Sequence, residues 1–289
     1  MTYKGIVLAG GMATRLSPVS NYVSKQLLPI YDKPLIYYPI SVLMLAGIKD
    51  ILIIVNKNHK NFFYNLLGDG SNLGIKISYE IQDKPNGIAE SFLIAEKFLK
   101  YSNVALILGD NIFYGRNLIK QLSIAKKKSK GATIFTCHLK NPNQFGVVRF
   151  DNNNKPISIV EKPKKYISNQ VVTGLYFYDN QIVDIAKTLK PSPRNELEIT
   201  DVNNIYIKEN QLEIIDLGRG FTWFDTGTFD KMLEASNFVK TIEDTHGLKI
   251  SCLEEIAFQN NWVDKKKLLD IIRDIKNKNY KAYLKSIIK

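Results

Sequence analysis

The sequence predicts an α/β protein with a doubly wound, mixed but mostly parallel sheet, a small antiparallel subdomain and C-terminal helices. Apolar strand-like runs alternate with helix-like segments over the first 110 residues, which is typical of a parallel sheet with helices on both faces. From residue 131 the runs become shorter and turn residues separate them, which indicates antiparallel strands. In the last 25 residues, lysines alternate with leucine and isoleucine, which predicts an amphipathic helix.

The chain opens with a strand, a loop, a helix and a second strand. The first strand is predicted at residues 5–9, and Gly10 and Gly11 then break it into a loop. A helix is expected over 34–46, where apolar residues recur at near-helical spacing before a glycine stop. Residues 50–56 form a continuous branched apolar run, which indicates a strand buried on both faces.

The same patterns predict the remaining elements. Helices are expected at 59–68 and 88–99, and strands at 75–81, 104–108, 132–139, 145–150, 157–161 and 173–178, with a turn at 151–154. Ligands of such sheets bind beyond the carboxyl ends of the parallel strands. The glycine loop, Gln82 and Asp110 would all lie there.

Composition excludes several classes of protein. Of the 289 residues, 45% are hydrophobic and 24% charged, which is ordinary for a soluble protein. No apolar run approaches the roughly 18 residues of a membrane span, and no signal-peptide pattern is present, so we expect a cytoplasmic protein without a membrane partner. Cys137 and Cys252 stand far apart in no paired motif, so we expect neither a disulfide framework nor a zinc site.

The net charge of +12 raises the question of nucleic acid. Much of the lysine excess is scattered, and its densest part lies in the C-terminal amphipathic segment, where it is typical of a solvated basic face. No aromatic-interleaved basic motif or zinc-finger spacing accompanies it. We therefore expect no nucleic-acid partner, whereas nucleotides would suit a basic pocket.

The loop after the first strand has the composition of a phosphate-binding site. Gly10 and Gly11 let backbone N–H groups approach phosphate oxygens closely, and Thr14, Arg15 and Lys25 follow in the same loop. A tight turn followed by surface cations explains the same pattern about as well. These residues alone leave both interpretations open.

Two single aspartates each stand where a strand meets a loop. Asp110 directly follows the strand at 104–108, and Asp225 lies in a Gly/Thr-rich loop before a predicted helix. Mg²⁺ typically takes one or two protein carboxylates together with phosphate oxygens and waters, so the pair is a candidate metal site. Asp110 fits equally well as the cap of a following helix.

Charged residues also gather in two later segments. Glu161 and Lys162 would face opposite sides of a regular strand, but Pro163 makes a break plausible that would turn both toward one cleft. Residues 194–201 then pack charge before a helix, with Thr200 or Asp201 expected near its cap.

Taken together, these motifs resemble the sugar-1-phosphate nucleotidylyltransferases, and most closely those of the dTDP-rhamnose pathway. The resemblance is carried by LAGGMATRLSP, KQLLP, KPLIYYPISVLMLAGI, LGDNIFYG, FGVVRFD, VEKP, TGLYFYD, RNELEITDVN and FTWFDTGT, which run in the expected order from residue 6 to about residue 260. It implies a Rossmann-like nucleotidyltransferase fold with a catalytic domain at 1–240. Residues of about 131–220 would include its partly antiparallel, sugar-binding part, and 241–289 would form a C-terminal helical segment packed on the same domain.

The resemblance implies transfer of a thymidylyl group from dTTP to α-D-glucose 1-phosphate, with Mg²⁺ as cofactor and pyrophosphate as leaving group. A sister enzyme that uses UTP or another hexose 1-phosphate is the alternative, since thymine and uracil differ by one methyl group. A non-catalytic nucleotide-sugar-binding regulator is less favoured. Family members are commonly homotetramers, and feedback inhibition by dTDP-rhamnose would involve residues 113–116 and Arg219.

The resemblance also assigns roles residue by residue. Gln82 would contact the pyrimidine edge, assisted by Gly87. The nucleotide side would consist of Gly10, Gly11, Thr14, Arg15, Gln82, Gly87 and Asp110, and the sugar-phosphate side of Gly146, Glu161, Lys162, Val172, Tyr176 and Arg194. Catalysis would depend on Arg15, Lys25, Asp110, Lys162 and Asp225, and Mg²⁺ would be held by Asp110 and Asp225.

Three positions that depart from the family pattern lie near the expected nucleotide site. Met12 and Ala13 replace the usual Ser and Gly of the phosphate loop. If Ala13 needs a positive φ, the loop carries a penalty of roughly 1–2 kcal/mol. Glu90 replaces the usual Gln after the base-binding segment, which leaves the choice of nucleotide open.

Overall fold

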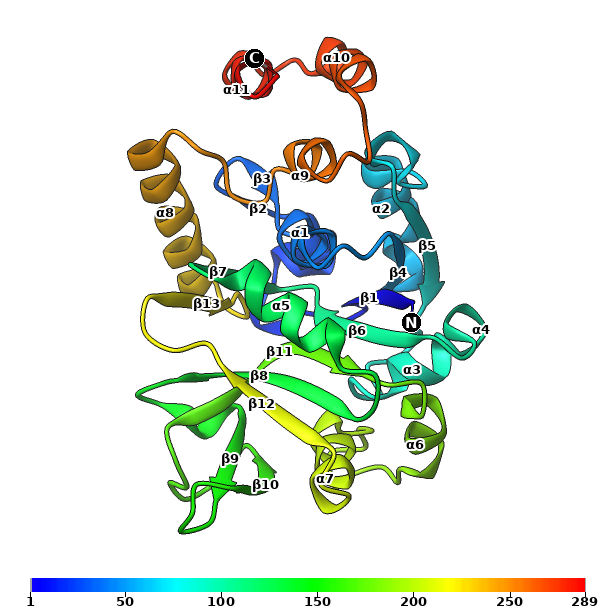
Figure 1. Ribbon diagram of the computed structural model, residues 1–289, viewed down its shortest axis with the longest axis vertical. Coiled ribbons are helices and arrows are strands. Elements are labelled where there is room, and N and C mark those ends of the chain that lie inside the picture. Colours follow the sequence, from blue (N-terminus) through cyan, green and yellow to red (C-terminus); the bar gives the residue numbers. More distant parts are fainter. Residues whose placement is uncertain (1, 289) are drawn as a thin grey trace.

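The structure, a computed structural model that describes residues 2–288, is built around a nine-stranded sheet (Figure 1). Its central order is β12 (Leu212–Asp216), β8 (Ala132–His138), β11 (Gln170–Tyr178), β6 (Asn103–Leu108), β1 (Tyr3–Ala9), β4 (Asp50–Val55) and β5 (Lys76–Ile81). The strands from β6 to β5 are parallel, whereas β11 is antiparallel to both of its neighbours β6 and β8. This arrangement confirms the predicted mixed, doubly wound sheet.

Helices cover both faces of the sheet (Figure 1). On one face lie α1 (Tyr37–Leu45), α2 (Lys60–Leu67), α5 (Leu118–Lys127) and α9 (Leu253–Gln259), and on the other α3 (Glu90–Ile94), α4 (Glu96–Leu99), α6 (Ile182–Thr188) and α7 (Ile199–Lys208). Successive side chains of a strand point to opposite faces. In β4, Ile51, Ile53 and Val55 therefore enter one core and Leu52 and Ile54 the other, and all five are fully buried, as the continuous apolar run predicted.

The antiparallel part extends the same sheet. β9 (Gly146–Phe150) and β10 (Pro156–Glu161) form a hairpin, and β9 joins the sheet where Val147 pairs with Val171 of β11. The predicted turn at 151–154 is closed by the Asp151 carboxylate, which accepts hydrogen bonds from the N–H groups of Asn153 and Lys155. This hairpin confirms the antiparallel interpretation of the segment that begins at residue 131.

A separate two-stranded sheet corrects one interpretation. Asp110 is followed by β7 (Asn111–Gly115), which pairs antiparallel with β13 (Phe221–Asp225). Asp110 therefore does not cap a helix. Helix α8 (Phe229–His246) begins after Asp225, and the Thr228 side chain caps it by accepting a hydrogen bond from the N–H of Lys231 at 3.3 Å.

Several helical boundaries differ from the prediction. The helix expected at 88–99 divides into α3 and α4 because the backbone of Ala95 (φ −84°, ψ 1°) leaves the helical region. Helix α7 begins at Ile199, so Thr200 and Asp201 lie inside its first turn and Glu198 occupies the cap position. The C-terminal segment forms two helices, α10 (Lys265–Asp274) and α11 (Lys278–Ser286).

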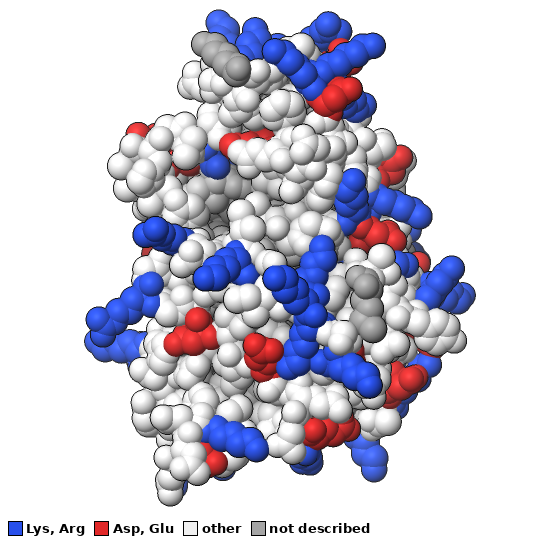
Figure 2. Space-filling view, viewed as in Figure 1, with Lys and Arg blue, Asp and Glu red and all other residues white. Residues whose placement is uncertain are grey.

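The C-terminal helices show the expected amphipathic character. Leu268, Ile272 and Leu284 are buried together with Cys252, and most of the lysines of this segment are exposed. Figure 2 shows this basic surface at the top of the molecule, over α10 and α11. Among residues 2–288, no helix combines the length and the apolar character needed to cross a membrane.

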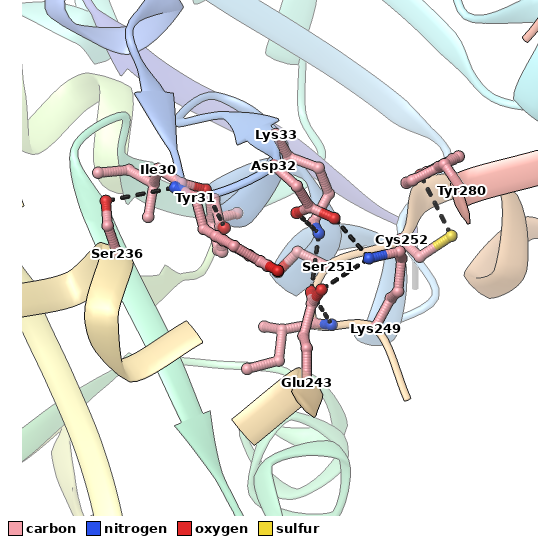
Figure 3. Close-up of polar contacts among 12 residues, drawn as sticks. Ile30, Tyr31, Asp32, Lys33, Ser236, Glu243, Lys249, Ser251, Cys252 and Tyr280 are labelled. Atoms are coloured by element: carbon pink, nitrogen blue, oxygen red, sulfur yellow. Dashed lines mark hydrogen bonds and ion pairs between the residues drawn. The ribbon is translucent and has the colours of Figure 1, made fainter. Parts of the chain in front are cut away.

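A cluster of four charged side chains, of which two are buried, fastens the end of α8 to the hairpin of β2 (Pro29–Ile30) and β3 (Lys33–Pro34) (Figure 3). Lys33 pairs with Glu243 at 2.8 Å and with Asp32, and Lys249 pairs with Glu243 at 2.7 Å and with Asp32. The side chains of Lys33 and Glu243 are only 2% and 5% exposed. Each charge has two opposite charges beside it, which offsets the cost of removing it from water.

We expect Glu243→Gln to lower the free energy of unfolding by about 3–5 kcal/mol, because it leaves the buried Lys33 ammonium with an incomplete set of partners. Urea denaturation at pH 7 measures this change. Asp244→Asn is the matched control, since it breaks an ion pair of the same helix, Lys240–Asp244, in which both side chains are more than half exposed. The control should lose no more than about 1 kcal/mol. Equal losses in the two variants would contradict the role given to the cluster.

Candidate active site

Two adjoining pockets lie beyond the carboxyl ends of β1, β5 and β6. The small pocket has a volume of about 220 Å³ and is lined by Leu8, Gly11, Ala13, Lys25, Gln26, Gln82, Pro85, Gly87, Ile88, Leu108, Asp110 and Glu196. The large pocket, of about 650 Å³, includes Arg15, Asn111, Phe145, Gly146, Glu161, Lys162, Val172, Tyr176, Thr200, Trp223 and Asp225 in its lining. Ile88 and Leu108 line both pockets, so the two form one cleft.

The two predicted aspartates meet in this cleft because β13 pairs with β7. The register places Asp225 opposite Asn111, the residue next to Asp110. The carbonyl oxygen of Asp110 also accepts hydrogen bonds from the N–H of Thr226 at 3.1 Å and from its hydroxyl at 2.8 Å. Asp110 lines the small pocket and Asp225 the large one, so the pair stands where the pockets join.

Opposite and like charges set the ionisation of the two carboxyls. Burial opposes ionisation of Asp110, but the ammonium of Lys25, which pairs with it directly, outweighs burial and lowers its pKa. Burial and the negative charge of Asp110 raise the pKa of Asp225 to about 6, against the opposing effect of Lys25, Arg15 and Lys162. The other four residues predicted to be catalytic therefore all lie within electrostatic reach of Asp225.

The donor set fits a hard divalent cation. Two carboxylates stand at the junction, and the negative charge of Asp110 is, after burial, the second cause that raises the pKa of Asp225. In the part of the chain that the structure describes, no group of three or more His, Cys, Asp and Glu side chains could hold a metal ion. An ion bound by the aspartates would therefore complete its coordination with phosphate oxygens and water, as Mg²⁺ commonly does.

The phosphate loop is divided between the pockets. Gly11 and Ala13 line the small pocket, whereas Thr14 lines a neighbouring hollow of about 600 Å³ together with Met12. Arg15 was predicted on the nucleotide side, but its side chain lines the large pocket. Ala13 adopts the left-handed conformation (φ 47°, ψ 40°), which costs a residue with a side chain roughly 1–2 kcal/mol and which glycine adopts without that cost.

The predicted base-binding residues lie together at the end of β5. Gln82 is buried and lines the small pocket beside Gly87. A Cβ atom on Gly87 (φ 107°) would stand 2.3 Å from the carbonyl oxygen of Leu197, so only glycine fits this close approach. Gly10 packs against Gln82, because a Cβ atom there would stand 2.6 Å from Gln82 Oε1.

The large pocket gathers most of the residues predicted for the sugar phosphate. Lys162 has a φ of 44°, so the chain bends after Glu161 and both side chains line the pocket, as the predicted break requires. Gly146, Val172 and Tyr176 lie in the same lining. The Glu161 Oε2 atom accepts a hydrogen bond from the Thr200 hydroxyl at 2.7 Å.

Arg194 is the predicted sugar-side residue that the structure places apart from the pocket lining. Its guanidinium donates to Glu198 at 2.7 and 3.1 Å and lies 3.4 Å from carboxylate oxygens of Glu161 and Glu196. A guanidinium is a suitable group to bind a phosphate, but three carboxylates already surround that of Arg194. Arg194 therefore stands behind Glu161, at the edge of the site.

Asn111 is a site residue to which the sequence reasoning gave no role. Its Nδ2 donates to Asp110 Oδ1 at 2.9 Å, and its Oδ1 accepts from Trp223 Nε1 at 2.7 Å and from the N–H of Gly174 at 3.1 Å. These bonds orient the Asp110 carboxylate and connect it to β13 and β11. Its position in LGDN, directly after the candidate ligand, was the only sequence sign of this role.

The chain is similar in sequence to known enzymes over nearly its whole length. The nucleotidyl transferase family model matches residues 4–242. A glucose-1-phosphate thymidylyltransferase of Neisseria meningitidis serogroup A is 51% identical over 286 residues, which cover 99% of each chain.

Solved structures show the same likeness. A Bacillus anthracis protein, provisionally described as a glucose-1-phosphate thymidylyltransferase and crystallised with sucrose, matches with a TM-score of 0.76 and 37% identity. The match covers 82% of the present chain and 95% of the other. A UDP-glucose pyrophosphorylase complexed with UDP-glucose matches with a TM-score of 0.73 and 25% identity over 84% of the present chain and 100% of the other.

Asp225→Asn should stabilise the protein without added metal at pH 8, by on the order of 2 kcal/mol. The reason is that the folded-state pKa of Asp225, about 6, lies above its ordinary value of 3.8, so ionisation of this partly buried carboxyl favours the unfolded chain. The gain should therefore decrease as the pH falls through about 6 and disappear near the ordinary pKa. Urea denaturation across this pH range measures it.

The control for this prediction is Asp83→Asn, which changes an exposed aspartate near the same cleft. It should leave the pH dependence of stability unchanged. A stabilisation by Asp225→Asn that is equal at every pH would contradict the electrostatic explanation.

Proposed function

The chain belongs to the nucleotidyl transferase family and is a nucleotidyltransferase, and from that premise we propose that it transfers a thymidylyl group from dTTP to α-D-glucose 1-phosphate. The products would be dTDP-glucose and pyrophosphate. The observation that carries the proposal is the pair of adjoining pockets with one aspartate in each. A nucleotide in the small pocket and a sugar phosphate in the large one would bring their phosphates together at Asp110 and Asp225.

The reaction needs charge neutralisation and positioning more than a nucleophile of the protein. A sugar-phosphate oxygen attacks the α-phosphorus of dTTP, the P–O bond to the leaving pyrophosphate breaks, and the two oxygens stand in line. We assign Lys25 and Arg15 to the phosphate charges and Lys162 to the sugar phosphate, in keeping with their places around the two aspartates. Mg²⁺, held by Asp110 and Asp225, would supply further charge neutralisation at the phosphates.

The walls of the two pockets suit their proposed ligands. In the small pocket, Leu8, Pro85, Ile88 and Leu108 offer apolar surface for a base and a deoxyribose, and Gln82 offers a polar group. In the large pocket, Glu161 and the backbone at Gly146 would bind hexose hydroxyls, with Val172 and Tyr176 beside them. We place this activity in the cytoplasm, as the first step of dTDP-rhamnose biosynthesis for cell-surface polysaccharide.

Pyrophosphate release tests the proposal directly. With Mg²⁺ and glucose 1-phosphate, we expect turnover with dTTP, and much slower turnover with CTP, ATP and GTP. Asp110→Asn should lower kcat/KM by roughly 10²–10³, the scale of losing one preorganised electrostatic group, and removing Mg²⁺ with a chelator should abolish turnover.

Asp83→Asn, at an exposed aspartate near the cleft, should retain the wild-type rate. A strong preference for UTP would favour the second candidate function, that of a UTP-dependent sister enzyme, to which the likeness to a UDP-glucose pyrophosphorylase points. No pyrophosphate release with any of dTTP, UTP, CTP, ATP and GTP would overturn the proposed activity.

We also propose that the protein assembles as a homotetramer and that dTDP-rhamnose inhibits it at a third pocket, away from the cleft. This pocket, of about 320 Å³, is lined by Phe113, Tyr114, Gly115 and Ile119, among others, and also by Lys249. Three residues of the expected segment 113–116 thus line it. Arg219 lies outside its lining, in the connection between β12 and β13.

Ile119→Glu tests this second site, because it adds a negative charge at an exposed pocket residue far from the proposed chemistry. We expect dTDP-rhamnose to inhibit the wild-type tetramer non-competitively, and the variant to need at least about tenfold more inhibitor at an unchanged basal rate. Light scattering measures the assembly. Purely competitive inhibition that Ile119→Glu leaves unchanged would contradict the proposal.

A further inference from the structure

The side-chain amide of Gln82 is held in one orientation. Its Nε2 donates to Glu90 Oε2 at 2.8 Å and to the carbonyl oxygen of Gly87 at 3.3 Å. Within residues 2–288, both hydrogen bonds of this side chain thus use the nitrogen, and Oε1 accepts none. The Oε1 atom lies beside Gly10, and Gln82 itself lines the small pocket. The Gln82 amide therefore offers a ligand of this pocket an acceptor, Oε1, and no further donor.

Glu90 determines this orientation without lining the pocket itself. It is the first residue of α3, and its other oxygen, Oε1, accepts a hydrogen bond from Asn86 Nδ2 at 2.8 Å. An ionised carboxylate has only acceptors. If the Gln82 amide turned over, its oxygen would face the carboxylate and the carbonyl of Gly87, and both hydrogen bonds would be lost. A glutamine at position 90 offers a donor as well as an acceptor, so it would tolerate either orientation.

We infer that Glu90 is a positioning residue that fixes Gln82 Oε1 toward the nucleotide base and thereby selects bases that carry a donor at ring nitrogen N3. The inference rests on the proposed function, in which Gln82 contacts the pyrimidine edge. Thymine and uracil carry an N3–H group, which matches the Oε1 acceptor. Cytosine has an unprotonated N3, whose lone pair would face the lone pairs of Oε1.

The glutamate at position 90 therefore affects the choice between cytosine and the other two pyrimidines, but not the choice between thymine and uracil. It makes no difference between thymine and uracil, because both present the same N3–H group. It discriminates against cytosine, because a polar pocket atom that a ligand leaves unpaired or repels weakens binding by at least about tenfold. Glu90 would thus limit which bases bind by orienting Gln82, although Glu90 itself does not line the pocket.

The test compares equilibrium binding of dTTP and dCTP in the presence of Mg²⁺ and without sugar phosphate, so that no turnover is needed. The wild-type protein should bind dTTP more tightly than dCTP. Glu90→Gln should reduce the ratio of the two Kd values about tenfold, mainly by tighter binding of dCTP, because Gln82 can then turn its NH₂ group to the base. Glu90→Ala, which also frees the amide, should reduce the ratio in the same direction.

Glu96→Gln is the matched control, since Glu96 begins the next helix and pairs with Lys187 at the surface. It should leave the ratio at the wild-type value, and the melting temperature of each variant reports on folding. A ratio unchanged by Glu90→Gln, or an equal loss of affinity for both nucleotides, would overturn the inference. Failure of the proposed activity would instead appear as a wild-type protein that binds dTTP but releases no pyrophosphate.

Discussion

The antiparallel pairing of β13 with β7 is the contact on which the candidate site depends. It brings Asp225 beside Asp110, two residues that lie 115 positions apart in the chain, and Thr226 secures the approach through two hydrogen bonds to the Asp110 carbonyl. Partial burial and the negative charge of Asp110 both oppose ionisation of Asp225 and raise its pKa. The cations of the phosphate loop reduce it, and a divalent cation would reduce it further.

Two features of the site oppose folding, and contacts elsewhere in the fold offset them. Ala13 holds a left-handed backbone in the phosphate loop, and Asp225 holds a carboxyl whose ionisation opposes folding. The sheet that supports them is buried on both faces, and the charged cluster around Glu243 fastens α8, the helix that follows Asp225, to the β2–β3 hairpin. The sheet and the charged cluster together keep the strained loop and the two aspartates in place for binding phosphates.

Several side chains of this cleft are oriented by polar neighbours. Asn111 orients Asp110, and Glu198 holds Arg194 at the edge of the large pocket. Glu90 acts on Gln82 in the same indirect way. Each is a polar partner whose hydrogen bonds leave only one orientation for the side chain in front of it. Of these three neighbours, Glu90 is the one that departs from the family pattern.

The sequence alone determined the strands and helices that build the sheet, the glycine loop after β1, and the placement of Asp110 and Asp225 at strand ends. These features follow from local rules, namely hydrophobic periodicity and glycine geometry. The bend before Pro163, which turns Glu161 and Lys162 toward one pocket, was expected from the proline in the same way. Only the tertiary structure decided that β7 follows Asp110, that Ala13 has a positive φ, that Arg15 lines the large pocket, and that Glu90 orients Gln82. The physical reason is that hydrogen bonds and charges between segments distant in sequence depend on strand register and packing, which no local pattern contains.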